Sequence, residues 1–183
     1  MCLMDDQNPI SGLIPRSIFL DQTIPASIRT GPSALAMFDY PHDSWKEAAD
    51  EGGHAGSDAA IAEVIRRLED VLPATCALAA LGYMTFATMI SGPRFSDHRK
   101  VVVKAVTHVN AQVIDWKGIK LGAPRIVAAL VMAQAHDTVT PAGLVYEAAR
   151  LVFGPAVVWQ PDRVEAWIHR DGNWHPFDQR PNP

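Results

Sequence analysis

Cysteine is scarce in this sequence, and the signature motifs of common enzyme classes are missing. The two cysteines, Cys2 and Cys76, lie far apart and outside any Cys-x-x-Cys pair, which argues against a disulfide framework and a zinc knuckle. The chain also lacks a Gly-x-Ser-x-Gly elbow, a P-loop and a Gly-x-Gly-x-x-Gly fingerprint. We therefore expect no catalytic residue, no metal and no cofactor, in a protein that is not an enzyme.

The histidines do not form a recognisable metal-ligand pattern. His169 and His175 are separated by five residues, which matches none of the zinc hydrolase spacings. A small metal-dependent hydrolase that uses His169, His175 and Asp171 stays an alternative, and it requires these side chains to converge in one pocket.

No basic-then-apolar segment opens the chain, so we predict no targeting signal and expect a cytoplasmic protein. The only long uncharged run covers residues 74–90, and it has three interpretations: a buried core helix, a membrane span, or two pieces broken at Gly82. Because the run is short and weakly apolar for a span, a membrane partner is not expected.

Charge is modest in amount and unevenly distributed. Charged residues make up 20% and hydrophobic residues 48%, which is typical of globular proteins, and the formal net charge is −4. Residues 1–96 hold six basic and twelve acidic side chains, whereas residues 97–183 hold ten and eight, giving −6 and +2. The second part can therefore present a locally positive surface.

The pattern divides the chain into three parts. Residues 1–56 read as an extended, proline-rich and apolar arm with a short helix, which we expect to cover the core or a partner subunit. Residues 57–92 read as a two-helix segment, beginning with a helix that Ser57 caps. Residues 93–183 form the third part, a small compact domain with an irregular tail.

In the third part, segments in which apolar and polar residues alternate are followed by segments with apolar residues at helical spacing. Residues 100–110 are β-branched and predict a strand, and residues 112–121 predict a hairpin that turns at Lys117-Gly118. A helix is expected from Pro124, a second from Thr140-Pro141 to Gly154, and a third over residues 161–170.

This order resembles the winged-helix effector domain of the OmpR/PhoB-type transcriptional regulators, over about residues 100–172. Trp116–Leu121 is similar to the family's hairpin, Val139-Thr140 to the bridge and cap of its second helix, and Asp162–Arg170 to its recognition helix. After Gly172 the chain departs from the family's basic, glycine-tyrosine wing. The resemblance implies an α+β, mainly α fold: an N-terminal arm and helices, a small β-meander and a three-helix winged-helix-like domain.

The resemblance also implies a DNA-binding protein, in which the third helix reads base edges and other basic residues contact phosphate. The residues expected in the groove are Arg163, Ala166, His169 and Arg170. Those expected on phosphate are Lys117, Lys120, Arg125 and Thr140. The predicted partners are double-stranded DNA and, through residues 1–92, a second copy or another protein. An adaptor or assembly protein with the same fold and no DNA binding is the alternative function.

Overall fold

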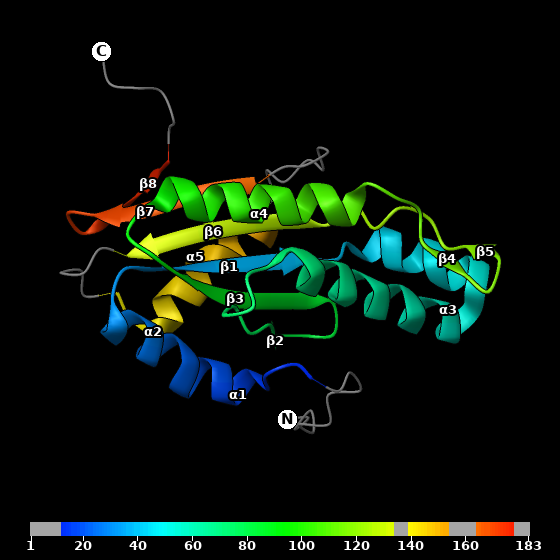
Figure 1. The fold of residues 1–183 in the computed structure, drawn as a ribbon, viewed down its shortest axis with the longest axis horizontal. Helices are drawn as coiled ribbons and strands as arrows, with labels where there is room; N and C mark the ends of the chain where they lie inside the picture. Colours follow the sequence, from blue (N-terminus) through cyan, green and yellow to red (C-terminus); the bar gives the residue numbers. More distant parts are fainter. Residues whose placement is uncertain (1–11, 134–138, 154–163, 178–183) are drawn as a thin grey trace, which may run out of the picture.

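The chain is built around a mixed six-stranded β-sheet, which the computed structural model describes over residues 12–133, 139–153 and 164–177 (Figure 1). The strand order is β2-β3-β1-β6-β7-β8, and among these described strands only β6 and β7 run parallel. The strands are β1 (Ser33–Asp39), β2 (Ala79–Ala80), β3 (Thr85–Ser91), β6 (Val127–Ala133), β7 (Val164–Arg170) and β8 (Asn173–Pro176).

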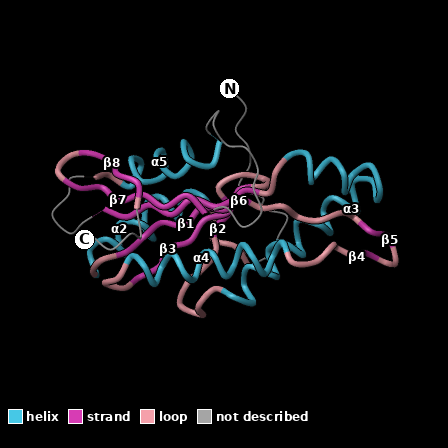
Figure 2. The backbone as a smooth tube through the Cα atoms, turned by 90° about the horizontal axis from the view of Figure 1, so that it is seen from above, coloured by secondary structure: helices cyan, strands magenta, loops and turns pink. Residues whose placement is uncertain are grey.

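Helices cover both faces of this sheet (Figures 1 and 2). One face carries α3 (His42–Val71) and α4 (Phe95–Asn110), and the other carries α5 (Pro141–Phe153) and the N-terminal helices. The N-terminal helices are α1 (Arg16–Ile18), a π-helical turn (Phe19–Thr23) and α2 (Ile24–Thr30). A separate hairpin of β4 (Asp115–Trp116) and β5 (Ile119–Lys120) packs on α3 at one end of the molecule.

Strand β1 lies in the middle of the sheet and joins the two halves of the core. Its residues alternate between the faces: Phe38 packs in the cluster under α3 and α4, and Leu35 and Met37 pack in the cluster under α5 and α2. Both faces are covered, so nearly the whole strand is buried. Such a strand shows no alternation of polar and apolar residues in its sequence.

The predicted winged-helix architecture is wrong. Residues 100–110 belong to α4, the segment after Pro124 becomes β6, and the described part of 161–170 is β7. In α4 the buried side chains recur at helical spacing, as in Val102, Val106 and Val109. Packing of this stripe on the sheet outweighs the β preference of valine.

The prediction for the N-terminal arm is also wrong in its local structure. Residues 16–30 are helical despite Pro25, which lies just after the π-helical turn Phe19–Thr23, at the point where α2 begins. Strand β1 follows. Part of residues 1–41, namely 1–11, lies outside the described residues.

Two local predictions are confirmed and one is confirmed in part. The short helix expected before residue 57 and the helix expected after it both belong to α3, which is interrupted at Gly53 by a backbone φ of 64°. Ser57 does not cap the second helix as predicted, because it lies within α3 and its hydroxyl donates to the His54 carbonyl oxygen at 2.9 Å. The hairpin turns at Lys117-Gly118, whose φ values are both positive, at 54° and 83°. Helix α5 begins at Pro141 as predicted, and the Gly143 N–H donates to Thr140 Oγ1 at 3.1 Å.

The uncharged run 74–90 contains two strands rather than a helix. Strands β2 and β3 pair in antiparallel fashion across a bend that includes Gly82. None of the described helices combines the length and apolar character that a membrane crossing requires. The three predicted parts of the chain each supply strands to the same sheet, with β1 in the first, β2 and β3 in the second, and the others in the third.

Candidate functional site

A pocket of about 340 Å³ lies at the junction of β1 and α3. We call it the β1–α3 pocket; its lining residues are Pro41, Asp43, Ser44 and Arg125. Pro41 has extended backbone angles and precedes the first residue of α3, so the helix begins at the pocket. The first N–H groups of a helix have no intrahelical acceptor, and the helix dipole is positive at this end. The location therefore favours a negatively charged ligand.

Two side chains of the pocket are suited to bind such a ligand. Ser44 is 1% exposed, and its Oγ has no hydrogen-bond partner among the described residues. A buried hydroxyl of this kind is uncommon in folded proteins, since its desolvation is not compensated. Arg125 lies in the loop before β6 with a left-handed φ of 53°, a strained conformation for a residue with a side chain. Strain of this kind is often found at binding sites.

Glu47 of α3 holds the Arg125 guanidinium at the pocket. The distance from Arg125 Nη2 to Glu47 Oε2 is 3.3 Å, and both side chains are about two-fifths exposed. Gly122 leaves room for this carboxylate, because a Cβ at position 122 would lie 2.7 Å from Glu47 Cδ. An alanine at this position would displace the end of the Glu47 side chain.

Tyr40 is buried and directly precedes Pro41 of the pocket. Its hydroxyl donates to the Ser44 carbonyl oxygen at 3.0 Å. Burial raises the pKa of Tyr40 to about 12; the negative charge of Glu47 acts in the same direction and Arg125 opposes it. The phenol is therefore neutral at physiological pH and serves as a structural donor.

Asp39, the last residue of β1, is the carboxylate with the most altered environment near the pocket. Thr85 Oγ1 donates to Asp39 Oδ1 at 3.0 Å from the first residue of β3. Burial raises the pKa of Asp39 to about 6, and the Thr85 hydrogen bond only partly offsets this effect. Asp39 therefore changes its charge at about pH 6.

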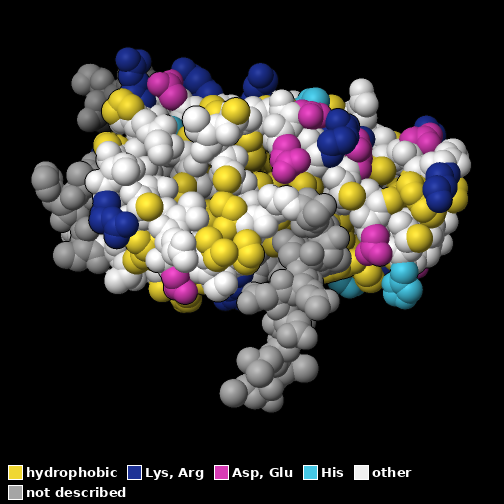
Figure 3. All heavy atoms as spheres, turned by 60° about the horizontal axis from the view of Figure 1, so that its bottom comes forward, with side chains coloured by type: hydrophobic (Ala, Val, Ile, Leu, Met, Phe, Trp, Pro, Cys, Tyr) yellow, Lys and Arg dark blue, Asp and Glu magenta, His cyan; other side chains and the backbone are white. Residues whose placement is uncertain are grey.

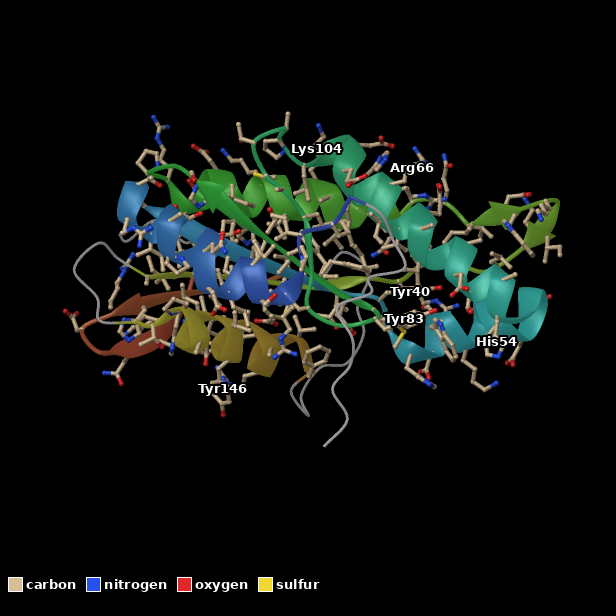
Figure 4. All side chains as sticks on the ribbon, turned by 90° about the horizontal axis from the view of Figure 1, so that it is seen from below. Tyr40, His54, Arg66, Tyr83, Lys104 and Tyr146 are labelled. Carbon is tan, nitrogen blue, oxygen red and sulfur yellow. The ribbon has the colours of Figure 1, made fainter. Side chains whose placement is uncertain are left out.

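The segment Leu81–Thr85, which we call the β2–β3 turn, approaches α3 from the other side. Figure 4 shows Tyr83 of this turn and Tyr40 close together beside α3. The Tyr40 N–H donates to the Met84 carbonyl oxygen at 2.9 Å, and the Tyr83 hydroxyl donates to Asp58 Oδ1 of α3. The turn is thus attached both to the pocket segment and to the helix.

Of the residues predicted to contact phosphate, Arg125 is the one that lines the pocket. Lys117 and Lys120 lie on the β4–β5 hairpin, where Lys120 pairs with Asp115 at 2.9 Å and Lys117 stacks over Trp116. Thr140 caps α5. The prediction thus selected one pocket residue, although on the wrong secondary structure.

The residues predicted to enter a DNA groove do not form an outward helical face. Ala166 and His169 are buried in β7, and Arg170 is exposed at its end. Arg163 lies outside the described residues. The β4–β5 and β7–β8 hairpins lie at opposite ends of the molecule (Figures 1 and 2), and on the face in Figure 3 the basic side chains are dispersed. These positions do not produce one continuous basic surface.

Sequence reasoning missed most of the pocket. Asp39 and Ser44 were not singled out because β1 was not recognised, so the end of a strand before a helix was not identified. The signal available was Asp39-Tyr40-Pro41 followed by a helical segment. Within the described residues, no three His, Cys, Asp or Glu side chains lie close enough to hold a metal ion.

Comparison with solved structures identifies the fold. The GGDEF domain of DgcB from Caulobacter crescentus, in complex with c-di-GMP, has a TM-score of 0.70 at 19% identity, covering 91% of this chain and 96% of that one. Diguanylate cyclase SiaD from Pseudomonas aeruginosa, in complex with its activator SiaC, has a TM-score of 0.71 at 18% identity, with coverage of 87% and 60%. The active GGEEF domain of a diguanylate cyclase from Vibrio cholerae has a TM-score of 0.59 at 11% identity, with coverage of 75% and 85%.

The chain therefore has the α/β fold of GGDEF domains. At these identities the likeness establishes the fold alone. No family model matches the sequence, and no curated protein does.

These neighbours overturn the functional predictions made from the sequence. They are GGDEF domains, one of them in a diguanylate cyclase, rather than winged-helix effectors, so the predicted DNA-binding regulator, its double-stranded DNA partner and the adaptor and hydrolase alternatives are contradicted. The prediction that the chain is not an enzyme is contradicted as well, because the neighbours include diguanylate cyclases.

The letters in the names of these domains, read as residues, can be compared with this sequence. The chain contains neither Gly-Gly-Asp-Glu-Phe nor Gly-Gly-Glu-Glu-Phe, and its single Gly-x-x-x-Phe string is Gly-Tyr-Met-Thr-Phe at residues 82–86. This string spans the β2–β3 turn and the start of β3. It keeps the first glycine and the phenylalanine, and has Met84 and Thr85 where the names have two acids.

Proposed function

We propose that this protein binds a phosphate ester of guanosine, such as c-di-GMP or GTP, at the β1–α3 pocket. The observation that carries the proposal is the unpartnered hydroxyl of Ser44, buried at the start of a helix in a fold whose neighbours include a domain in complex with c-di-GMP. The helix N–H groups and the Ser44 hydroxyl supply donors to phosphate oxygens, and Arg125 supplies the positive charge.

Asp43 contributes a negative charge to the same pocket. A phosphate would be repelled by this carboxylate unless a cation accompanied it, so we expect Mg²⁺ to strengthen the binding of GTP. The proposal concerns binding, because the string at residues 82–86 offers no carboxylate to a metal ion. Conversion of GTP to c-di-GMP is measured in the same samples, and its detection would extend the proposal to catalysis.

Isothermal titration of the full chain with c-di-GMP, Mg²⁺-GTP and Mg²⁺-ATP tests the proposal. We expect binding of the guanosine compounds, about 10-fold weaker binding for Arg125→Gln, and about 10- to 100-fold weaker binding for Ser44→Ala, as expected for lost hydrogen bonds to a charged group. Arg94→Gln is the matched control, because Arg94 is exposed, directly precedes α4 and does not line the pocket. Equal affinity for parent and Arg125→Gln, or no binding of either guanosine compound at millimolar concentration, would refute the proposal.

A further inference from the structure

The β2–β3 turn carries a side chain that a glycine could not provide. In the names of the neighbouring domains the second letter is glycine, and here that place in the string is Tyr83. Tyr83 is 51% exposed, yet its hydroxyl reaches α3 and donates to Asp58 Oδ1. The partners are 25 residues apart in the sequence, so this hydrogen bond joins two separate elements.

The same tyrosine lies next to the helical turn that forms the pocket. The Trp45 indole N–H is buried beside the Tyr83 hydroxyl without a hydrogen bond of good geometry, and Trp45 follows Ser44 directly. On the opposite side of the turn, the backbone bond from Tyr40 to Met84 and the bond from Thr85 to Asp39 hold the residues that lead into Pro41. The turn therefore restrains both ends of the pocket segment.

The β1–α3 pocket is small, so a restraint on the segment that forms it affects which ligands can enter. At about 340 Å³ the β1–α3 pocket is at the lower end of the about 300–1,000 Å³ found for small-molecule sites. We expect a guanosine phosphate to contact surface beyond the four lining residues as well. Trp45 follows Ser44 directly, and the Tyr83 hydroxyl, which is bonded to Asp58, approaches Trp45.

We propose that the Tyr83–Asp58 hydrogen bond is a latch, which holds the β2–β3 turn against α3 and restricts the pocket to its closed form. The latch is an intramolecular contact, and its effect on ligand affinity rests on the proposed function. If only the open form accepts the whole ligand, the apparent affinity is reduced by the fraction of molecules that are open. Removing the latch then tightens binding without adding a contact to the ligand.

Hydrogen exchange of the ligand-free chain tests the latch by itself. Tyr83→Phe removes the hydroxyl and keeps the ring, and Asp58→Ala removes the acceptor from an exposed position of α3, so neither variant opens a hole in the core. We expect amide exchange over residues 79–86 to become about 3- to 10-fold faster in both variants. Tyr146→Phe is the matched control, because Tyr146 is 71% exposed on α5 and points away from the sheet in Figure 4. Unchanged exchange in both test variants would overturn the latch.

Titration with c-di-GMP and Mg²⁺-GTP tests the effect on the pocket. We expect Tyr83→Phe to bind about 3- to 10-fold more tightly than the parent, with the parent value for Tyr146→Phe. A faster-exchanging turn with unchanged affinity would overturn the restriction of the pocket. Absence of binding in the parent and in all variants would remove the proposed function and the restriction together, whereas the exchange result would still decide the latch.

Discussion

At the scale of single residues, Asp39 is a carboxyl group whose folded environment disfavours its charge. Burial raises its pKa from 3.8 to about 6. Between these two values the folded chain binds more protons at Asp39 than the unfolded chain does, so this group makes the free energy of unfolding decrease as pH rises from about 4 to 6. The contribution of protonated Asp39 to the free energy of unfolding is fully present below about pH 4 and is lost as the pH rises through about 6.

Asp39→Asn should therefore stabilise the protein at pH 7 by about 1–3 kcal/mol and have little effect at pH 4. The asparagine keeps an oxygen that accepts from Thr85. Urea unfolding of parent and variant at both pH values measures the difference, with Asp21→Asn as an exposed control. Equal stabilisation at pH 4 and pH 7 would show that proton binding by Asp39 is not the cause.

Gly122 and Gly118 allow a test of whether the space beside Gly122 is needed by Glu47, because the two glycines have similar backbone angles and different surroundings. Both have positive φ, 87° and 83°, but a Cβ at 122 would meet the Glu47 carboxylate whereas one at 118 would meet nothing within 4 Å. Each alanine variant carries the backbone penalty of about 1 kcal/mol, and Gly122→Ala should lose up to about 1 kcal/mol more, because it displaces Glu47 from its ion pair with Arg125. Thermal unfolding of the two variants compares them, and equal losses would contradict the role assigned to Gly122.

At the scale of elements, Arg67 of α3 secures the end of α4. It is 6% exposed, and its Nη1 donates to the carbonyl oxygens of Val109 and Gln112 at 2.9 and 2.7 Å, while Nε donates to Glu63. These bonds satisfy carbonyl groups at a helix terminus, where the helix itself offers no donor.

The neighbouring Arg66 provides a matched comparison for Arg67. Arg66 is 58% exposed and pairs with Glu63 and Asp70 on the surface. We expect Arg67→Ala to lower the free energy of unfolding by about 3–5 kcal/mol and Arg66→Ala by no more than about 1 kcal/mol. Chemical denaturation measures both, and similar losses would mean that the buried bonds to α4 contribute little.

The elements also show where sequence patterns are informative and where they are not. The helix start at Pro141 and the turn at Lys117-Gly118 depend on local chemistry and could be predicted. Strands β1 and β6 could not, because burial on both faces removes the alternation that identifies a strand. In α4 the valines suggested a strand, although their spacing of three and four already contained the helical stripe.

At the scale of the whole molecule, the two sides of the core meet at β1, so they should unfold together. Leu68 of α3 and Leu144 of α5 are buried on opposite faces of the sheet. Each Leu→Ala variant should lose about 2–5 kcal/mol and lower the stability of both faces equally. Hydrogen exchange of α4 and α5 peptides across a denaturant series measures this, and separate midpoints for the two helices would exclude a single cooperative unit.

The candidate site is a property of the whole molecule and was largely beyond prediction. Arg125 was selected as a phosphate contact because it is basic, but its neighbours in the pocket come from a segment more than 80 residues earlier. That proximity depends on the pairing of β1 with β6. The periodicity of a sequence predicts the secondary structure of each segment separately. It does not predict which strands pair with each other.

Both margins of the β-sheet are poorly suited to recruit another strand. At one margin β2 has two residues and exchanges backbone hydrogen bonds with Ile14, and at the other β8 has four residues and ends at Pro176, which has no N–H to offer. Strand-to-strand addition, the usual first step of amyloid-type aggregation, is therefore disfavoured at both margins. Concentrated solutions of the folded protein should resist fibril growth, and loss of the Ile14 bridge should weaken that resistance at the β2 margin.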